Sequence, residues 1–293
     1  MPPAIGLIGL GLVGSALADR LLAGGQRVAG WDIDAGRRAA LGDRGGEIAR
    51  DGQDVFSRCS RVLLSLPTHR EVGDVVQAAR PSLRPGLTII DTTTGDPVST
   101  EELATTLEAQ GVGYLDATIS GSSAQVRAGS ATLMVGGDAK TFAACSDMFA
   151  LIAAQTFHTG PAGTGAKMKL VTNLVLGLNR AALAEGLAFA ESTGLDLNLS
   201  LAVMQASAAY SRIMDTKGER MIRGEFAPDA RLSQHLKDVQ LIVDTGRQAG
   251  LPMPLSAAHR AVLEEAEAEG YGDLDNSAII KVLLAPGRNR VPS

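Results

Sequence analysis

Aromatic residues, cysteines and histidines are scarce in this sequence of 293 residues: aromatics make up 3%, with only 2 cysteines and 4 histidines. Cys59 and Cys145 form no Cys-x-x-Cys pair, and the histidines are scattered along the chain. The sequence therefore predicts neither a disulfide framework nor a metal site. We interpret both cysteines as buried thiols.

Long apolar runs and basic clusters are also lacking. No stretch of about 18 apolar residues is present, so no membrane span is predicted. The formal net charge of -5, without a basic cluster, argues against nucleic acid or an anionic membrane as a partner. The start Met1-Pro2-Pro3 has neither a basic region nor a cleavage site, and we expect a cytoplasmic protein. With 45% hydrophobic residues, the chain can bury a core large enough for two domains.

A glycine-rich turn follows the apolar segment 4–8 and precedes a helical pattern from Ser15 to Leu22. This strand, turn and helix context is what a G-x-G-x-x-G dinucleotide motif requires. The first glycine permits the tight turn, the second lets a pyrophosphate approach the backbone, and the third lets helix and strand pack closely. The predicted cofactor-binding residues of this loop are Gly9, Leu10, Gly11, Val13 and Gly14.

A second predicted strand, Arg27 to Trp31, ends at Asp32, about 20 residues beyond the glycine loop. A carboxylate at this position accepts hydrogen bonds from the adenosine ribose. It favours NAD over NADP, because the 2′-phosphate of NADP would meet a like charge. Arg37 and Arg38 lie a few residues on, which keeps NADP possible. The alternative is that Asp32 merely caps the next helix.

Two further buried strands, 61–66 and 87–90, are each followed by a polar or proline-marked loop. Ligands of an open α/β sheet lie beyond the carboxyl ends of its strands, so we expect Leu66, Pro67 and Thr94 near the cofactor. Asp96 followed by Pro97 is also typical of a helix start.

A serine- and glycine-rich segment, Ser120-Gly121-Ser122, precedes a predicted strand at 131–135. Closely spaced N–H groups and hydroxyls can form a small anion site, with a carboxylate as the expected guest. The alternative is an ordinary hairpin turn.

A long proline-free segment runs from Ala166 to about Thr193, with Gly194 at the expected C-terminal position. A helix of roughly 28 residues, or about 42 Å, is long enough to join two domains. Lys169 and Asn173 are four residues apart and share one face of it. They can act together on a ligand, or Lys169 can extend to solvent while Asn173 packs in a groove.

The second half shows almost no strand pattern. Helices are predicted at 199–209, 212–223, 232–250, 256–270 and 277–284, and Pro286 to Ser293 looks loosely ordered. Lys237 is either a second pocket group or a solvated lysine. We predict an α/β domain over 1–162 and an all-helical domain over 163–293.

Together, the segments 6–14, 91–97, 116–122 and 163–173, with Lys237-Asp238, resemble the motifs of the β-hydroxyacid dehydrogenase family, which includes 3-hydroxyisobutyrate dehydrogenase. The resemblance covers nearly the whole chain. It implies a Rossmann-type dinucleotide-binding domain, an all-α C-terminal domain and a long central helix between them. It also implies roles for individual residues: Lys169 is catalytic, Asn173 orients substrate, Ser120, Gly121 and Ser122 hold the substrate carboxylate, and Thr94 and Lys237 meet the nicotinamide.

The activity implied is hydride exchange between NAD, or NADP, and a small 3-hydroxy acid or semialdehyde. Ser122 replaces a glycine of the family motif, Thr118 replaces a proline, and Ala230 stands where many members have phenylalanine, so substrate size can differ. The alternatives are an imine reductase on the same scaffold and a non-catalytic NAD-binding sensor. The apolar surface of the central helix predicts a homodimer or homotetramer.

Overall fold

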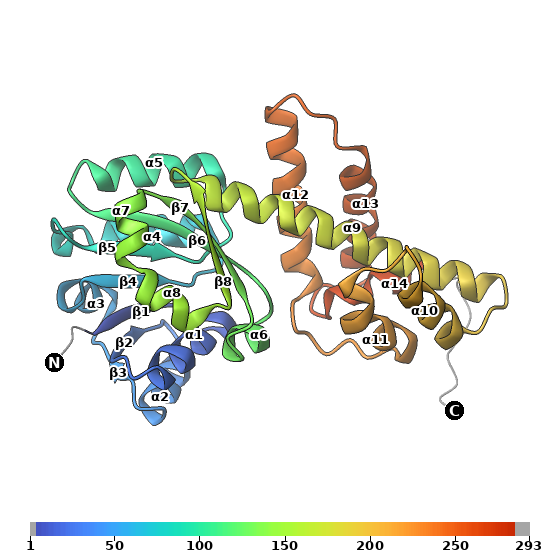
Figure 1. Cartoon of the computed structure of the whole chain (residues 1–293), viewed down its shortest axis with the longest axis horizontal. Coiled ribbons are helices and arrows are strands. Elements are labelled where there is room, and N and C mark those ends of the chain that lie inside the picture. The colour runs from blue at the N-terminus through green and yellow to red at the C-terminus, as the bar shows by residue number, and fades with distance from the viewer. Residues whose placement is uncertain (1–3, 285–293) are drawn as a thin grey trace. The chain divides into compact units, whose positions relative to one another are not determined.

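The computed structural model describes residues 4–284, which form two compact units, one ending at Lys169 and the other beginning at Leu170 (Figure 1). The predicted loose tail, Pro286 to Ser293, lies outside the described residues. Among residues 4–284, no helix is both long and apolar enough to cross a membrane.

The first unit is built on a sheet with the strand order β3-β2-β1-β4-β5-β6-β7-β8. Strands β1 to β6 are parallel, β7 runs antiparallel to β6, and β8 is parallel to β7. The strand order reverses direction next to β1, which is where doubly wound sheets bind ligands. The strands are β1 (Ile5–Ile8), β2 (Val28–Trp31), β3 (Glu47–Ile48), β4 (Arg61–Leu64), β5 (Thr88–Asp91), β6 (Gly113–Ser120), β7 (Thr132–Gly137) and β8 (Gln155–Gly160).

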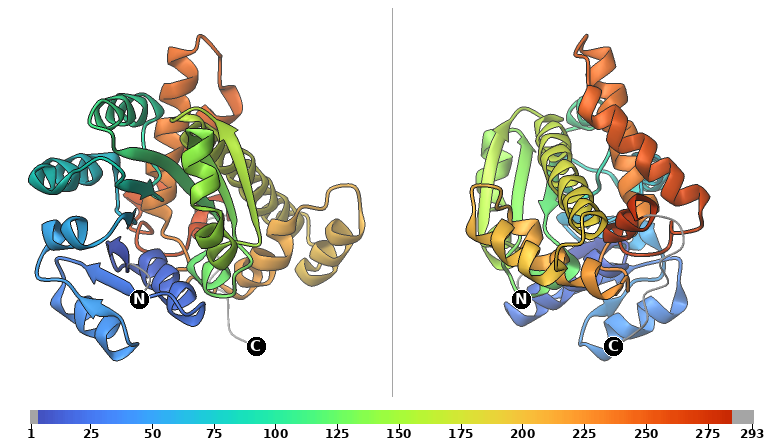
Figure 2. Two further views of the ribbon diagram at one scale, coloured as in Figure 1. Left: turned by 60° about the vertical axis from the view of Figure 1, so that its left-hand side comes forward. Right: turned by 90° about the vertical axis from the view of Figure 1, so that its right-hand side faces the viewer.

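Helices cover both faces of this sheet (Figure 2). One hydrophobic core lies between the sheet and helices α1, α6 and α8, and a second lies between the sheet and α3, α4 and α5. Both cysteines are buried thiols, as predicted. The helices are α1 (Leu12–Ala23), α2 (Ala35–Asp43), α3 (Gly52–Arg58), α4 (His69–Ala78), η1 (Arg80–Ser82), α5 (Pro97–Glu108), α6 (Ser123–Arg127), α7 (Ala139–Ala144) and α8 (Ser146–Ile152).

The parallel register brings the carboxyl ends of the central strands to one edge. Ile8 of β1 pairs with Leu64 of β4, Leu64 with Asp91 of β5, and Asp91 with Asp116 of β6. The loops after β1, β4 and β5 therefore start side by side, while β6 continues four residues further. This edge carries the glycine loop and both predicted cofactor loops.

The second unit is all-helical, as predicted, and its core includes Leu187, Leu201, Leu236 and Leu263. Helix α9, which begins in the first unit, has 29 residues (Thr164–Ser192) and confirms the long proline-free helix (Figure 1). The predicted helix 212–223 is confirmed, and it contains a π-helical turn at Met214–Gly218. The other elements are α10 (Leu197–Ala206), η2 (Met214–Gly218), α11 (Glu219–Arg223), α12 (Leu232–Gln248), α13 (Pro254–Ala268), η3 (Asn276–Ile279) and α14 (Ile280–Leu283).

Candidate active site

The three glycines of the first loop differ in what surrounds them. Gly9 has φ 91°, and a Cβ there would collide with the carbonyl oxygen of Ser65, while a Cβ on Gly14 would collide with the carbonyl oxygen of Gly9. A Cβ on Gly11 would meet only Arg37 Nη1, at 3.9 Å. Gly11 therefore leaves open space before the N-terminus of α1, where the N–H groups favour an anion. The loop fits the pyrophosphate of a dinucleotide.

Asp32 connects the end of β2 to this loop. Its carboxylate is buried, and Oδ2 accepts the N–H of Leu10 at 2.6 Å. Oδ1 accepts the N–H of Asp34 at 2.9 Å. The residue that caps α2 is Asp34, which accepts the N–H of Arg37. The alternative that Asp32 is the helix cap is therefore wrong.

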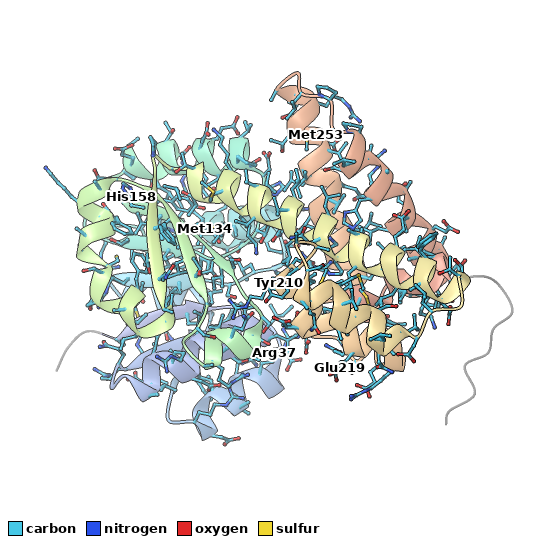
Figure 3. All side chains as sticks on the ribbon, turned by 45° about the vertical axis from the view of Figure 1, so that its right-hand side comes forward. Arg37, Met134, His158, Tyr210, Glu219 and Met253 are labelled. Atoms are coloured by element: carbon cyan, nitrogen blue, oxygen red, sulfur yellow. The ribbon has the colours of Figure 1, made fainter. Side chains whose placement is uncertain are left out.

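A cavity of about 250 Å³ lies against the glycine loop and is lined in part by Leu10, Gly11, Arg37 and Arg44. Arg37, labelled in Figure 3, places Nη1 3.5 Å from Asp32 Oδ2. Arg38 instead donates to the carbonyl oxygens at the end of β2. Of the two arginines considered for a 2′-phosphate, Arg37 is the one that faces this cavity.

The loops after β4 and β5 are joined by hydrogen bonds. The N–H of Leu66 donates to Thr93 Oγ1 at 3.2 Å, and Thr92 Oγ1 donates to the Leu64 carbonyl at 2.8 Å. Pro67 and Thr94 lie in these two loops, exposed and half-buried respectively. Asp96 caps α5 with Pro97 as its first residue, which confirms the predicted helix start. The linking role of Thr92 and Thr93 was not predicted, since it depends on the adjacent strand.

Ser120 is the last residue of β6, and Ser122 is the N-cap of α6. Ser122 Oγ accepts the N–H of Gln125, and Gln125 Oε1 accepts the N–H of Ser122 at 2.8 Å. Gly121 between the serines is exposed, with φ 145°. The segment is a strand-to-helix turn at the start of the longer connection between the antiparallel strands β6 and β7, and not a tight hairpin turn. Gly121 lies between two serines at the carboxyl end of β6.

Lys169 points towards this same strand. Its Nζ donates to the carbonyl oxygen of Ile119 at 2.6 Å, beside Ser120. Lys167, two residues earlier on α9, is exposed and pairs with Glu101 at 2.7 Å. The two lysines thus leave the helix in different directions, and the ammonium of Lys169 lies next to the serine-glycine turn.

Asn173 and Lys237 belong to the second unit. Asn173 is buried, and its Nδ2 donates to Asp238 Oδ2 on α12 at 3.0 Å. Lys237 precedes this aspartate and is half-buried. The hydrogen bond fixes the direction of the Asn173 amide within the helical unit.

Asp116 is a polar residue at this site whose role the sequence did not indicate. It lies in β6, is 2% exposed, and accepts the N–H groups of Gly163 and Ala166. Burial raises its pKa to about 6, against the hydrogen bonds from these two N–H groups, which lower it. The available signal was its alternation with Thr118 and Ser120 on one strand face.

Both units match known families. Residues 4–160 match the NAD binding domain of 6-phosphogluconate dehydrogenase, and residues 163–283 match the NAD-binding domain described for NADP-dependent 3-hydroxyisobutyrate dehydrogenase. The chain belongs to the β-hydroxyacid dehydrogenase family. It is an oxidoreductase that acts on hydroxy acids with NAD or NADP.

Individual relatives agree with this family. L-threonate dehydrogenase of Cupriavidus necator is 31% identical over 282 residues, covering 95% of each protein. 2-(Hydroxymethyl)glutarate dehydrogenase of Eubacterium barkeri is 32% identical over 282 residues, covering 95% of this chain and 94% of that protein. The structure of 3-hydroxyisobutyrate dehydrogenase of Mycobacterium tuberculosis matches with a TM-score of 0.90 at 26% identity, over 97% of this chain and 100% of that one. The β-hydroxyacid dehydrogenase fold inferred from the motifs is confirmed.

Proposed function

We propose that this enzyme transfers a hydride between the nicotinamide and the carbinol carbon of a small 3-hydroxy acid, or the aldehyde carbon of the corresponding semialdehyde, with Lys169 as general acid and base. The observation that carries the proposal is the position of Lys169 Nζ, 2.6 Å from the Ile119 carbonyl and beside Ser120. An ammonium held at the strand that ends in an anion-binding turn is suited to act on a hydroxyl next to a carboxylate.

Lys169 donates or accepts a proton according to the direction of the reaction. In reduction, its ammonium gives a proton to the carbonyl oxygen; in oxidation, its neutral amine takes the proton of the hydroxyl. An ammonium has three N–H donors, enough to hold the Ile119 carbonyl and a substrate oxygen together. The bound nicotinamide supplies the hydride donor or acceptor.

The substrate carboxylate is assigned to Ser120, Gly121 and Ser122. Their turn supplies hydroxyls and an exposed glycine without a side chain to obstruct the ligand. The capping contacts of Ser122 use its oxygen as an acceptor, and a hydroxyl can also donate. Asn173 is assigned to orient the substrate through Oδ1, because its Nδ2 donates to Asp238. Lys237 is assigned to contact the substrate and the nicotinamide.

The test compares two lysines of the same helix. Lys169→Ala should lower turnover by about two to four orders of magnitude, with NADH binding retained in a fluorescence titration. Lys167→Ala is the matched control, because Lys167 pairs with Glu101 on the surface and should keep normal turnover. Suitable substrates to screen are the acids in the names of the related enzymes: L-threonate, 2-(hydroxymethyl)glutarate and 3-hydroxyisobutyrate. Near-normal turnover of a folded Lys169→Ala enzyme would refute the assignment.

We infer that NAD is preferred over NADP. The buried carboxylate of Asp32 is suited to ribose hydroxyls and repels a 2′-phosphate, while Arg37 lies close enough to offset part of that charge. Asp32→Ala combined with Ile33→Arg should move the ratio of kcat/KM values towards NADP. If the parent enzyme already prefers NADP, Arg37 governs the choice, and Arg37→Ala should reverse it.

We infer a homodimer or homotetramer from the surface of the helical unit. Large apolar side chains are exposed on α9 and α10, including Val171, Val175, Phe189, Leu199 and Val203, at 52% to 68% of their surface. An apolar surface of this kind is typical of a subunit interface. Light scattering at micromolar concentration tests this inference, and a monomer mass would reject it.

We also infer a cytoplasmic location. Both cysteines are buried thiols, which is usual for proteins of reducing compartments. Cell fractionation with an antibody tests this.

A further inference from the structure

The start of helix α9 is held by the carboxylate of Asp116. Oδ1 accepts the N–H of Gly163 at 3.0 Å, and Oδ2 accepts the N–H of Ala166 at 2.8 Å. N–H groups of a first helical turn have no partner within the helix, and they carry the positive end of the helix dipole. A buried carboxylate at this position satisfies two of these donors at once.

The start of α9 packs closely against β6 and β7. Glycines stand at both contact points: a Cβ on Gly136 would collide with Asp116 Oδ1, and one on Gly165 would collide with the Asp116 carbonyl oxygen. Thr118, two residues further on the same face of β6, donates through Oγ1 to the Gly165 carbonyl at 2.9 Å. Three hydrogen bonds therefore attach the first turn of α9 to β6.

Lys169 lies one turn beyond this attachment. Its Nζ donates to the carbonyl oxygen of Ile119. Helix α9 therefore contacts β6 at two places, first at Asp116 and then at Ile119, next to Ser120. The distance between Nζ and the serine-glycine turn consequently depends on how the first turn of α9 sits on β6.

We propose that Asp116 is a positioning residue for catalysis, which holds the first turn of α9 on β6 and thereby sets Lys169 relative to the turn at Ser120. This rests on the proposed role of Lys169. A displacement of a reacting group by about 1 Å can cost about 100-fold in rate, so a positioning residue can affect turnover strongly without touching substrate.

Asp116→Asn is the sharpest test, because it keeps the shape of the side chain. The new NH2 group cannot accept a hydrogen bond, so it would face the N–H of Gly163 or Ala166 with no acceptor between them. We expect kcat to fall about 10- to 100-fold, while the KM for the nicotinamide cofactor stays within about twofold, since the glycine loop is untouched. Should this variant not fold, Thr118→Val removes one bond from the same turn and should lower kcat in the same direction.

Asp54→Asn is the matched control. Asp54 is also a buried carboxylate of the first unit that accepts a backbone N–H, from Arg50 at 3.1 Å, but it lies on α3. Asp54→Asn should lower the urea midpoint of unfolding, because it weakens the contacts of Asp54 with Arg50 and Arg58. Only Asp116→Asn should lower kcat. An unchanged kcat in Asp116→Asn, or an equal loss in Asp54→Asn, would overturn the positioning role.

A double-mutant cycle separates this proposal from that of Lys169 itself. If Asp116 acts through Lys169, then Asp116→Asn should change kcat by less than about twofold in a Lys169→Ala background. If it lowers kcat by its full factor there, Asp116 acts by another route and the positioning role is wrong. Near-normal turnover of Lys169→Ala alone would instead refute the proposed mechanism, and the positioning role with it.

Discussion

The two units hold their buried carboxylates in different ways. Asp116 in β6 is held by backbone N–H groups, and burial raises its pKa to about 6. Asp275 in the helical unit is 0% exposed, yet its pKa is lowered to about 2. Burial pushes that pKa up as well, but hydrogen bonds from Ser277 and the ammonium of Lys217, at 2.9 Å, outweigh it.

The difference reflects the cation beside Asp275, and not the supply of backbone donors. Asp275 also accepts backbone N–H groups, from Asp229, Ala230 and Ser277. Loops at strand ends and the first turns of helices offer N–H groups to a carboxylate, whereas the interior of a helix uses its N–H groups for itself. Asp116 and Asp275 both lie where such N–H groups are available, so the ammonium of Lys217 accounts for the lower pKa of Asp275. Arg180 of the helical unit is a buried charge with too few partners. It is 3% exposed, and its Nε and Nη1 have no acceptor among residues 4–284. Burial lowers its pKa to about 10.

Lys217→Met should have the largest effect, because it removes the cation that distinguishes Asp275 from Asp116. It would leave Asp275 buried without its closest cation, and we expect a loss of about 3–5 kcal/mol in the free energy of unfolding. Urea denaturation monitored by circular dichroism measures this loss. Lys167→Met is the control, since its exposed pair with Glu101 should contribute less than about 1 kcal/mol. Similar effects of the two substitutions would show that burial does not set the strength of the Lys217 pair.

The pH dependence of stability should have opposite signs for the two carboxylates. Asp116 has a folded-state pKa of about 6, above the ordinary 3.8, so the folded state binds more protons in this window. Its contribution to the free energy of unfolding should therefore fall, by about 2 kcal/mol, as pH rises from about 4 to 6. The stability from Asp275, whose pKa is about 2, should be complete above pH 4 and lost as pH falls through 2.

Urea titrations between pH 2 and 7 check both signs. Asp116→Asn should reduce the fall between pH 4 and 6, and Asp275→Asn should reduce the loss at low pH. Part of each remains, because the pKa of Asp91 is also raised and those of Asp54 and Asp138 are also lowered. Asp91, the neighbour of Asp116 on β5, also raises the pKa of Asp116, so Asp91→Asn should shift the upper window downwards. An unchanged pH profile in Asp116→Asn would contradict the raised pKa.

Arg180→Met should stabilise the helical unit, in contrast to Lys217→Met, because Arg180 is a buried cation without sufficient acceptors. It replaces a buried charge, whose Nε and Nη1 lack acceptors among residues 4–284, with an apolar side chain, and we expect a gain of about 1–2 kcal/mol in the free energy of unfolding. The pKa of His259, lowered to about 4 by burial and by Arg180, should rise in the same variant, measured by NMR titration. Arg223→Met, at an exposed position, should change stability by less than about 0.5 kcal/mol. Destabilisation by Arg180→Met would show that the charge is satisfied.

The smallest effect is expected at Ser122 of the first unit, whose hydroxyl caps α6. Ser122→Gly should cost only a few tenths of a kcal/mol as a helix cap. If the hydroxyl also binds the substrate carboxylate, the KM for substrate should rise about 2- to 10-fold. Gln125→Ala is the control, because it removes the capping partner and keeps the hydroxyl. An equal rise of KM in both variants would assign the effect to the cap alone.

Much of the fold was predictable because it depends on residues close together in the chain. The glycine loop, the strand ends and the long proline-free helix follow from local periodicity and turn chemistry. Strands β3 and β8 were not predicted, for physical reasons. β3 has only two residues, and β8 is an edge strand whose side chains are exposed or half-buried, with no apolar pattern. The serine-glycine segment fits either a tight hairpin turn or a strand-to-helix turn, and the capping box at Ser122 shows that a helix follows it before the chain returns in β7.

By itself, the sequence determined the dinucleotide loop and the spacing of Lys169 and Asn173, because one turn of helix puts residues i and i+4 on one face. Tertiary structure alone decided which donors reach Asp116, since Gly163 and Ala166 are 47 and 50 residues away and meet it only when α9 packs on β6. It also decided that Arg180 is buried. Hydrogen bonds and burial between distant segments depend on how the elements pack, and no local pattern encodes that packing.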